Sequence, residues 1–271
     1  MNSFPSLRIL LVSPLLLLPF LLLPLPITLI LLSSLLILWY YLLSRPSPSF
    51  FSSSSRLLLI IAHPDDETMF FSPLIRNAIR NGVRVFVLCL SSGDFYGEGD
   101  TRRKELFKAV VPLGIDPSDV TIIDMEECKD GTEWPPSRLL PLIRRFVLSL
   151  DVHLVVTFDD VGVSGHCNHT ACSLAIKAAR SIIPIGVEML RLESPSLIRK
   201  YSSILSLVIS FFRDSSQSTV ISSPSDIIST WRAMEEHRSQ LLWFRYLYML
   251  TSSLLFTNSF TRVPTRVRSR Y

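Results

Sequence analysis

The apolar run at residues 57–61 passes, after one alanine, into His-Pro-Asp-Asp-Glu at residues 63–67. A short continuous apolar run that ends in a turn signal indicates a strand buried on both faces, as in a parallel sheet. Sheets of this kind bind ligands at the carboxyl ends of their strands. Because Pro64 biases the residue before it toward an extended conformation, we expect His63 at the strand tip rather than in the following helix. The segment therefore predicts an α/β fold with one imidazole and three carboxylates at an edge of the sheet.

Two adjacent carboxylates, Asp65 and Asp66, can divide their roles in such a site. Neighbouring side chains on extended backbone point to different sides, so one carboxylate can bind a metal while the other stays free as a base. A helix start is the alternative interpretation. Proline at the first helical position, followed by acidic residues in the first turn, is ordinary chemistry for a helix N-terminus.

A second polar cluster, Gly-His-Cys-Asn-His at residues 165–169, follows the apolar run at residues 154–158 and two aspartates. The chain has five histidines, and three of them, His63, His166 and His169, lie in these two clusters. Imidazole and carboxylate are ordinary zinc ligands, and a catalytic zinc needs only three ligands from the protein. The four cysteines form no C-x-x-C pair, which argues against a structural zinc finger. The combination favours a metal site, with a structural role as the alternative for each histidine taken separately.

Strands and helices are expected to alternate through the middle of the chain. The predicted strands are at residues 57–61, 83–90, 120–123 and 154–158, and the predicted helices are at 70–81, 101–113 (capped by Asp100) and 137–150. This alternation predicts a Rossmann-like, doubly wound, mostly parallel sheet. His63 and His169 would then meet above strand ends at one edge.

The N-terminal segment predicts a membrane anchor. Residues 9–43 carry no charge, and the helix expected at 27–43 is at the short end of the ~17 to 25 residues that span a bilayer. The aromatic run at residues 39–41 would form an interfacial belt. A cleaved signal peptide and a buried helix are the alternatives; the apolar stretch exceeds a typical signal core, and no small-residue cleavage pattern follows it. Arg8 before the span, with Arg45 and Arg56 after it, leans toward a cytoplasmic C-terminal domain.

These features divide the chain into four parts. They are a membrane anchor at residues 1–44, a Ser/Pro linker at 45–56, an α/β domain at 57–250 and a basic tail at 251–271. Two apolar segments, 197–212 and 241–256, are short and contain charges, so we expect peripheral packing on a membrane rather than further spans. The tail would either bind anionic lipid or form a frayed terminus. The modest net charge of +4 gives no reason to expect a nucleic-acid partner.

A loop with three glycines, residues 91–100, follows the second predicted strand. Its position beside Arg102 near a helix N-terminus would suit a phosphate, although an ordinary surface loop is the alternative. Arg103 competes with Arg102 for this role.

The motifs AHPDDE and SGHCNH resemble those of the zinc-dependent LmbE-like N-deacetylases. Further stretches match in order: LCLSSGDFYGEGDTRRKEL, FDDVGVSGHCNH, LESPSLIRKY and HRSQLLWFR. The resemblance covers residues 57–245 and is closest to the eukaryotic subgroup that acts on N-acetylglucosaminyl-phosphatidylinositol. Asn168 stands where bacterial members typically have Asp, and this HxNH form resembles the eukaryotic subgroup.

The resemblance implies a metal-dependent amide hydrolase. His63, Asp66 and His169 would bind Zn2+ or another divalent metal, Asp65 would be the general base, and His166 would stabilise the oxyanion. Arg102 would contact the substrate phosphodiester. The implied reaction is the second step of glycosylphosphatidylinositol-anchor biosynthesis, on the cytoplasmic face of the endoplasmic reticulum membrane, with a glycophosphoinositide lipid as substrate. The alternatives are a zinc deacetylase of another acetylated glycoside and a non-catalytic membrane subunit with the same fold.

Overall fold

The computed structural model describes residues 24–52, 56–212 and 218–264. A seven-stranded sheet in the order β3-β2-β1-β4-β5-β7-β6 forms its centre. The strands are β1 Arg56–Ile61, β2 Arg84–Cys89, β3 Val120–Ile122, β4 Leu154–Phe158, β5 Glu188–Leu192, β6 Thr219–Ile221 and β7 Thr257–Arg262. Strands β1 to β5 run parallel, whereas β7 is antiparallel to both of its neighbours. The prediction of a mostly parallel α/β sheet is confirmed.

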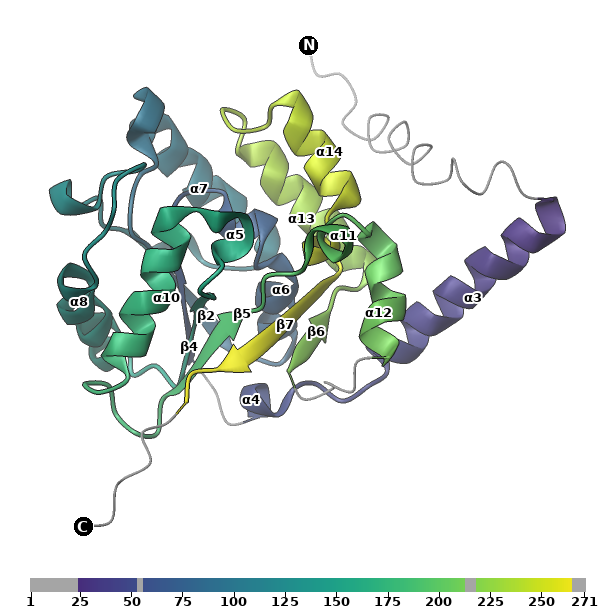
Figure 1. The fold of residues 1–271 in the computed structure, drawn as a ribbon, viewed down its shortest axis with the longest axis horizontal. Coiled ribbons are helices and arrows are strands. Elements are labelled where there is room, and N and C mark those ends of the chain that lie inside the picture. The colour runs from purple at the N-terminus through teal and green to yellow at the C-terminus, as the bar shows by residue number, and fades with distance from the viewer. Residues whose placement is uncertain (1–23, 53–55, 213–217, 265–271) are drawn as a thin grey trace.

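The sheet is covered by helices on both faces (Figure 1). The helices are α3 Leu25–Leu43, α4 Ser49–Ser52, α5 Asp66–Met69, α6 Ser72–Arg80, α7 Gly99–Leu113, α8 Pro136–Ser149, α9 Gly162–Gly165, α10 Cys167–Ala179, α11 Leu197–Lys200, α12 Ser206–Phe212, α13 Pro224–Glu236 and α14 Trp243–Thr251. Right-handed crossovers place α6 and α7 on one face and α8 and α10 on the other. Consistent with this, α8 packs against α10, and α13 packs against α7.

The centre of the sheet explains why the first strand reads as a continuous apolar run. Strand β1 lies between β2 and β4, and its residues 57–61 are completely buried. The strand order reverses between β1 and β4, because β1 continues to β2 on one side while β4 follows on the other. Open α/β sheets bind their ligands at such a switch point, outside the carboxyl ends of the strands.

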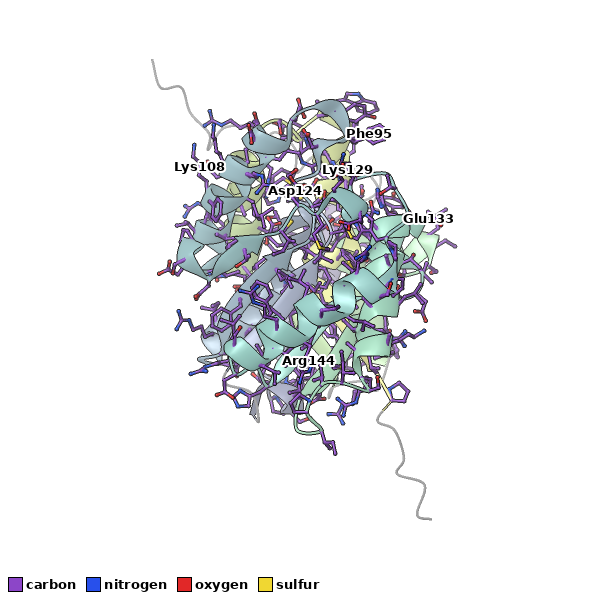
Figure 2. The ribbon with its side chains drawn as sticks, turned by 90° about the vertical axis from the view of Figure 1, so that its left-hand side faces the viewer. Phe95, Lys108, Asp124, Lys129, Glu133 and Arg144 are labelled. Carbon is purple, nitrogen blue, oxygen red and sulfur yellow. The ribbon has the colours of Figure 1, made fainter. Side chains whose placement is uncertain are left out.

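The loops that follow the strands gather at one end of the molecule. In Figure 2, Phe95 and Asp124 come from the loops after β2 and β3, and both lie at the same end as Lys129 and Glu133. Arg144, in the middle of α8, lies farther down.

Most element boundaries agree with the predicted ones within a few residues, but one prediction is wrong, and two of the predicted segments contain regular structure. Asp100 does not cap α7: the helix begins at Gly99 after Glu98, and Asp100 lies in its first turn. The expected linker contains α4, whose Phe50 and Phe51 are buried in the core. The expected basic tail contains β7, which pairs with β5 and β6.

One helix among the described residues, α3, is long and apolar enough to cross a membrane, and only 6% of its apolar window is buried. This fits the predicted anchor. The anchor's first 23 residues, Arg8 among them, and the arginines of the tail beyond residue 264 lie outside the described residues.

Candidate metal centre and active site

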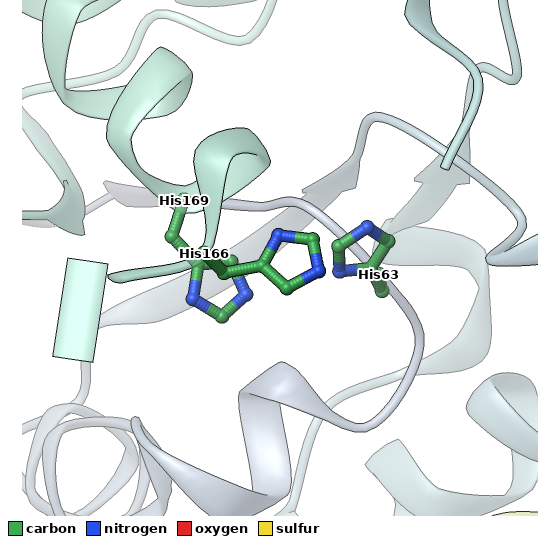
Figure 3. Close-up of side chains that lie close together, drawn as sticks. All are labelled: His63, His166 and His169. Carbon is green, nitrogen blue, oxygen red and sulfur yellow. The ribbon is translucent and has the colours of Figure 1, made fainter. Parts of the chain in front are cut away.

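Three histidines from two distant segments meet at the switch point of the sheet (Figure 3). His63 follows β1, and His166 and His169 lie at the start of α10, after β4. The ring of His63 is centred 4.9 Å from that of His166 and 5.7 Å from that of His169. One ring nitrogen from each histidine lies within 4.8 Å of the others. The two clusters therefore form a single site, as the order of parallel strands predicts.

Asp66 completes this group from the first residue of α5. Its Oδ2 accepts hydrogen bonds from the backbone N–H groups of Ala62, at 3.0 Å, and His63, at 2.9 Å. Its Oδ1 lies 3.1 Å from Nε2 of His169. Burial alone would raise the pKa of Asp66, but the neighbouring His169 and His63 outweigh it and lower that pKa. Asp66 is therefore a buried, ionised carboxylate aimed at two imidazoles.

In His169 and His63, a hydrogen bond at one ring nitrogen determines which of the two nitrogens carries the lone pair. His169 Nδ1 lies 3.0 Å from the carbonyl oxygen of Gly162, so Nδ1 carries the proton and Nε2 has the lone pair. His63 Nε2 lies 3.0 Å from Asp130 Oδ1, which leaves the lone pair on Nδ1, the atom 3.9 Å from Asp66 Oδ2. In the part of the chain that the structure describes, His169 Nε2 has no hydrogen-bond partner. A buried lone pair that faces a carboxylate oxygen is stable only with a cation or a proton between the two.

Three donor atoms therefore fit a metal ion: His63 Nδ1, Asp66 Oδ1 and His169 Nε2. Tetrahedral zinc with bonds of 2.0–2.1 Å holds its ligand atoms about 3.4 Å apart. His169 Nε2 lies 3.1 Å from Asp66 Oδ1, close to this value, and His63 Nδ1 lies 3.9 Å from Oδ2, the other oxygen of the same carboxylate. Without a metal, a proton takes the cation's place, and the pKa of His169 is accordingly raised: burial would lower it, but Asp66 outweighs burial.

His166 lies in the same group of three but its ring faces differently. It is the N-cap of α10, and its Nδ1 accepts the backbone N–H of Asn168 at 3.3 Å. The proton of the neutral ring is therefore on Nε2. Burial, His63 and His169 lower the pKa of His166, which favours the neutral ring. A neutral His166 is a hydrogen-bond donor through Nε2, and it is also one of the three histidines whose ring nitrogens lie close enough to hold a metal ion.

Asp65 differs sharply from its neighbour, although not for the reason expected. Its φ is +109°, so the backbone here is not extended. A non-glycine residue with positive φ is strained and persists only where its surroundings hold it. The side chain of Asp65 is buried and pairs with two guanidinium groups, Arg245 Nη2 at 3.1 Å and Arg102 Nη2 at 3.5 Å. The two adjacent carboxylates therefore have different partners: Asp66 lies against imidazoles, and Asp65 pairs with arginines.

Arg102 lines the site, and its guanidinium is already engaged. Nη1 donates to the carbonyl of Gly93 at 2.9 Å, and Nη2 donates to the carbonyl of Pro64 at 2.6 Å. Gly93 has φ of +70°, and a Cβ there would lie 2.2 Å from Arg102 Nη1, so the close approach requires glycine. Arg103 instead pairs with Asp124 at 2.6 Å. Of the two competing arginines, Arg102 is the one at the site.

A buried pair behind the site was missed from the sequence. His237 and Glu67 are both completely buried, and His237 Nε2 lies 2.6 Å from Glu67 Oε1. The other oxygen of Glu67 accepts the backbone N–H of Asp65 at 3.1 Å. Burial would lower the pKa of His237, but Glu67 outweighs it and raises that pKa. The pair therefore holds the strained backbone of Asp65 from behind.

Two further residues, Asp130 and Arg245, also had no predicted role. Asp130 fixes the tautomer of His63, and Arg245 pairs with Asp65. A stretch that includes His237 and Arg245 carries part of the family resemblance, but no spacing rule connects either residue with Asp65.

Asn168 contacts the ring of His166 through its backbone N–H, while its side chain bonds elsewhere. Its side chain donates to the carbonyl of Thr132 at 2.6 Å, and its Oδ1 lies 3.3 Å from the N–H of Gly131 and 3.2 Å from His63 Nε2. Asn168 therefore ties α10 to the loop that carries Asp130.

A cavity of about 200 Å³ joins these groups. The lining residues are His63, Asp65, Asp66, Phe70, Arg102, Asp130, Ser164, His166, His169, Gln240 and Arg245. Sites for drug-sized ligands measure ~300–1,000 Å³, so this cavity takes one small group and leaves the rest of a larger ligand outside.

Comparisons with known proteins agree with this geometry. Residues 58–180 match the profile of the PIG-L family, described as GlcNAc-PI de-N-acetylase. The N-acetylglucosaminyl-phosphatidylinositol de-N-acetylase of Bos taurus is 42% identical over 204 residues, which cover 73% of this chain and 79% of the bovine protein. A probable enzyme of the same name from Schizosaccharomyces pombe is 34% identical over 211 residues, covering 74% of this chain and 84% of the yeast protein.

Similar folds also occur among solved structures. The N,N'-diacetylchitobiose deacetylase from Pyrococcus horikoshii superimposes with a TM-score of 0.60 over 83% of this chain and 90% of that one, at 16% sequence identity. At that identity the likeness shows the shared fold.

Proposed function

This chain belongs to the PIG-L family of GlcNAc-PI de-N-acetylases, and from this premise we propose that it hydrolyses the N-acetyl group of N-acetylglucosaminyl-phosphatidylinositol. The products are glucosaminyl-phosphatidylinositol and acetate. In the cell this reaction is the second step of glycosylphosphatidylinositol-anchor biosynthesis. The observation that carries the proposal is the convergence of the two distant motifs on one buried cavity, where an ionised carboxylate, free imidazole lone pairs and a separate carboxylate lie together.

We assign His63, Asp66 and His169 as the ligands of a zinc ion or another divalent metal. The assignment rests on the ring nitrogens left free by Asp130 and Gly162 and on the unpartnered Nε2 of His169. A zinc ion bound by these residues would lower the pKa of a water and polarise the acetamide carbonyl.

Asp65 is the proposed general base. Its carboxylate takes a proton from the attacking water while the water oxygen bonds to the acetamide carbon. The same carboxyl group then gives a proton to the amine nitrogen as the carbon–nitrogen bond breaks, which releases acetate and the free amino sugar. Arg245 and Arg102 hold this carboxylate in place.

His166 is the proposed donor to the oxyanion of the tetrahedral intermediate. Its Nδ1 accepts the N–H of Asn168, so the neutral ring presents Nε2–H to the cavity. A preorganised donor of this kind acts where negative charge develops in the transition state.

Arg102 is the proposed contact to the phosphodiester. It lines the cavity, and its Nε has no hydrogen-bond partner among the described residues. The apolar helix α3 fits a membrane anchor. We place the protein in the endoplasmic reticulum membrane, with the catalytic domain on the cytoplasmic side and residues 45–56 as the connection to the anchor.

Acetate release from N-acetylglucosaminyl-phosphatidylinositol tests the proposal directly. The detergent-solubilised full-length protein would be compared with Asp65→Asn and His63→Ala, with metal content measured for each. We expect turnover by the wild type. Asp65→Asn should keep the metal and lose ~10²- to 10⁴-fold in kcat, because it removes only the base. His63→Ala should lose both metal and activity.

The outcomes separate the alternatives. Equal zinc binding by all three proteins without acetate release would contradict the metal site and favour a non-catalytic membrane subunit. Zinc bound as proposed, with release of acetate only from a soluble acetylated glycoside, would keep the site and change the substrate.

A further inference from the structure

An apolar surface lies on the C-terminal part of the domain. It is formed by α11, α12 and α14, and we call it the apolar surface below. Its most exposed members are Ile198 at 88%, Phe212 at 79%, Trp243 at 74% and Leu197 at 73%. Further exposed members are Tyr201, Leu205, Val208, Ile209, Phe211, Leu242, Phe244 and Leu247. The turn at Ser203–Leu205 contacts both α12 and α14 and so links these helices. Exposed apolar surface of this extent marks a site that contacts a partner or a membrane.

The apolar surface is continuous with the membrane-anchor helix. The C-terminal end of α3 packs against α12, where the rings of Tyr41 and Phe211 lie 6.1 Å apart. Trp39 of α3 donates a hydrogen bond to the carbonyl of Ser222 at 2.8 Å. In Figure 1, α11, α12 and α14 lie on the side of the sheet from which α3 projects. A bilayer crossed by α3 would therefore meet these helices first.

The charge of the apolar surface suits a phospholipid bilayer. Residues 194–212 and 241–263 contain no aspartate or glutamate. They do contain Arg199, Lys200, Arg245 and Arg262, of which Lys200 is buried. Exposed Leu, Ile, Phe and Trp beside basic residues, with no acidic ones, is the composition of segments that lie in the membrane interface.

The apolar surface also borders the cavity. Arg245, which pairs with Asp65 inside the cavity, is two positions after the exposed Trp243 on α14. On the other side, Lys200 of α11 donates to the carbonyl of Val163 at 3.2 Å, next to Ser164 in the cavity wall. The cavity of about 200 Å³ takes one small group, so the remainder of a lipid-linked ligand must leave along its rim.

We propose that the apolar surface docks on the bilayer that α3 crosses, so that the cavity opens at the headgroup level of the membrane. This contact goes beyond the proposed function, because it does not depend on which bond the site breaks. The bilayer is the chosen occupant because α3 already fixes the domain to it and the exposed helices continue from α3. A second copy of the chain or another protein would be a different occupant.

Depth-dependent quenching in lipid tests the docking on the full-length protein. In a Cys167→Ser background, which removes the one exposed cysteine among the four, single cysteines at Ile198, Phe212 or Trp243 would carry an environment-sensitive fluorophore. Ile185, at 74% exposure, and Tyr96, at 85%, are matched control positions outside these helices. The protein would be reconstituted in phosphatidylcholine nanodiscs with brominated acyl chains.

We expect quenching at the three positions of the apolar surface and none at the two controls. Labels on the apolar surface that stay unquenched would overturn the proposal, as would equal quenching at all five positions. The measurement would be repeated with two proteins in each disc. Loss of quenching together with energy transfer between labels on the two copies would identify a second copy as the occupant, and this would also overturn the proposal.

A kinetic measurement separates this inference from the proposed function. Ile198→Asp with Trp243→Asp should raise KM for the substrate in vesicles by about tenfold, the equivalent of ~1.4 kcal/mol, and leave KM for a short-chain soluble analogue unchanged. An equal change for both substrates would contradict docking. If the wild type cleaves neither, the proposed function fails, while the quenching result still decides the docking.

Discussion

The parallel half of the sheet and its antiparallel edge contribute to the candidate site in different ways. The parallel half, β1 to β5, supplies the reacting groups: His63 and Asp66 follow β1, and His166 and His169 follow β4. The C-terminal part, α13 and α14 with β7 and the edge strand β6, supplies His237, which pairs with Glu67, and Arg245, which pairs with Asp65. The chemistry thus lies on loops that a parallel sheet brings together, while its support comes from the end of the chain.

Two buried carboxylates, Glu67 and Asp226, join these parts through their ion pairs. Glu67–His237 lies directly behind Asp65. Asp226 on α13 pairs with Arg76, at 3.1 Å, and with Arg80, both on α6 and remote from the cavity. If the Glu67–His237 pair supports catalysis, breaking it must lower kcat. Breaking the ion pairs of Asp226 must lower the stability of the fold and leave kcat unchanged.

The largest effect should come from the parallel half itself. His169→Ala removes the donor that faces Asp66 Oδ1, and we expect loss of the metal together with activity at background level. Metal content and acetate release on the same preparation check this. Full activity with an unchanged metal content would show that His169 is structural and that the donor set is wrong.

A smaller loss is expected at His166, which does not hold the metal in this assignment. His166→Ala should lower kcat by ~10²- to 10³-fold through the lost oxyanion donor and leave the metal in place. His153→Ala is the matched control, because His153 precedes β4 while His166 follows it. Loss of metal from His166→Ala would instead make His166 a ligand.

Next in size is the effect of the pair behind Asp65. His237→Ala leaves Glu67 buried without its partner, which should cost ~3–5 kcal/mol of stability. Misplacement of Asp65 should lower kcat by up to ~10²-fold without loss of metal. His237→Gln, which restores a donor to Glu67, should recover part of kcat. Thermal midpoints, metal content and kcat of both variants check this; an unchanged kcat with a lowered midpoint would show that the pair is structural only.

The sequence predicts the parallel half well and the C-terminal part poorly, for physical reasons. Strands β1, β2 and β4 are buried on both faces and read as continuous apolar runs, and parallel strands end at one edge, so the meeting of His63 with His169 follows. Strand β7, by contrast, begins Thr257-Asn258-Ser259, three buried polar residues. Asn258 bridges the carbonyl of Phe70 and the N–H of Leu74, so its burial depends on partners far away in the chain.

The contact between Glu67 and His237 behind the site could not be predicted for the same reason. Glu67 and His237 are 170 positions apart, and no local pattern reports their contact. Only the fold of the C-terminal part onto α5 and α7 brings them together. The left-handed backbone of Asp65 is equally invisible, because Pro64 and the acidic run also suit an ordinary helix start.

The smallest effect, and the sharpest control, lies at Asp226. Asp226→Asn should cost ~1–3 kcal/mol of stability, because hydrogen bonds to charged groups are lost while Arg76 and Arg80 can still reach water. Burial would raise the pKa of Asp226, but Arg80, Ser223 and their hydrogen bonds outweigh it and lower that pKa. A carboxylate whose folded pKa is depressed contributes stability above its unfolded pKa of ~3.9, and this contribution is lost as the pH falls through the folded value.

Wild type should therefore lose more stability than Asp226→Asn as the pH drops below about 4, so the two thermal midpoints should converge in acid. At neutral pH, kcat and KM of Asp226→Asn should match the wild type. Because Asp226 joins the same two parts of the molecule as His237 does, equal loss of kcat in the Asp226 and His237 variants would mean that any weakening of the C-terminal part disturbs the site. A loss confined to the His237 variants would assign the support of Asp65 to the Glu67–His237 pair itself.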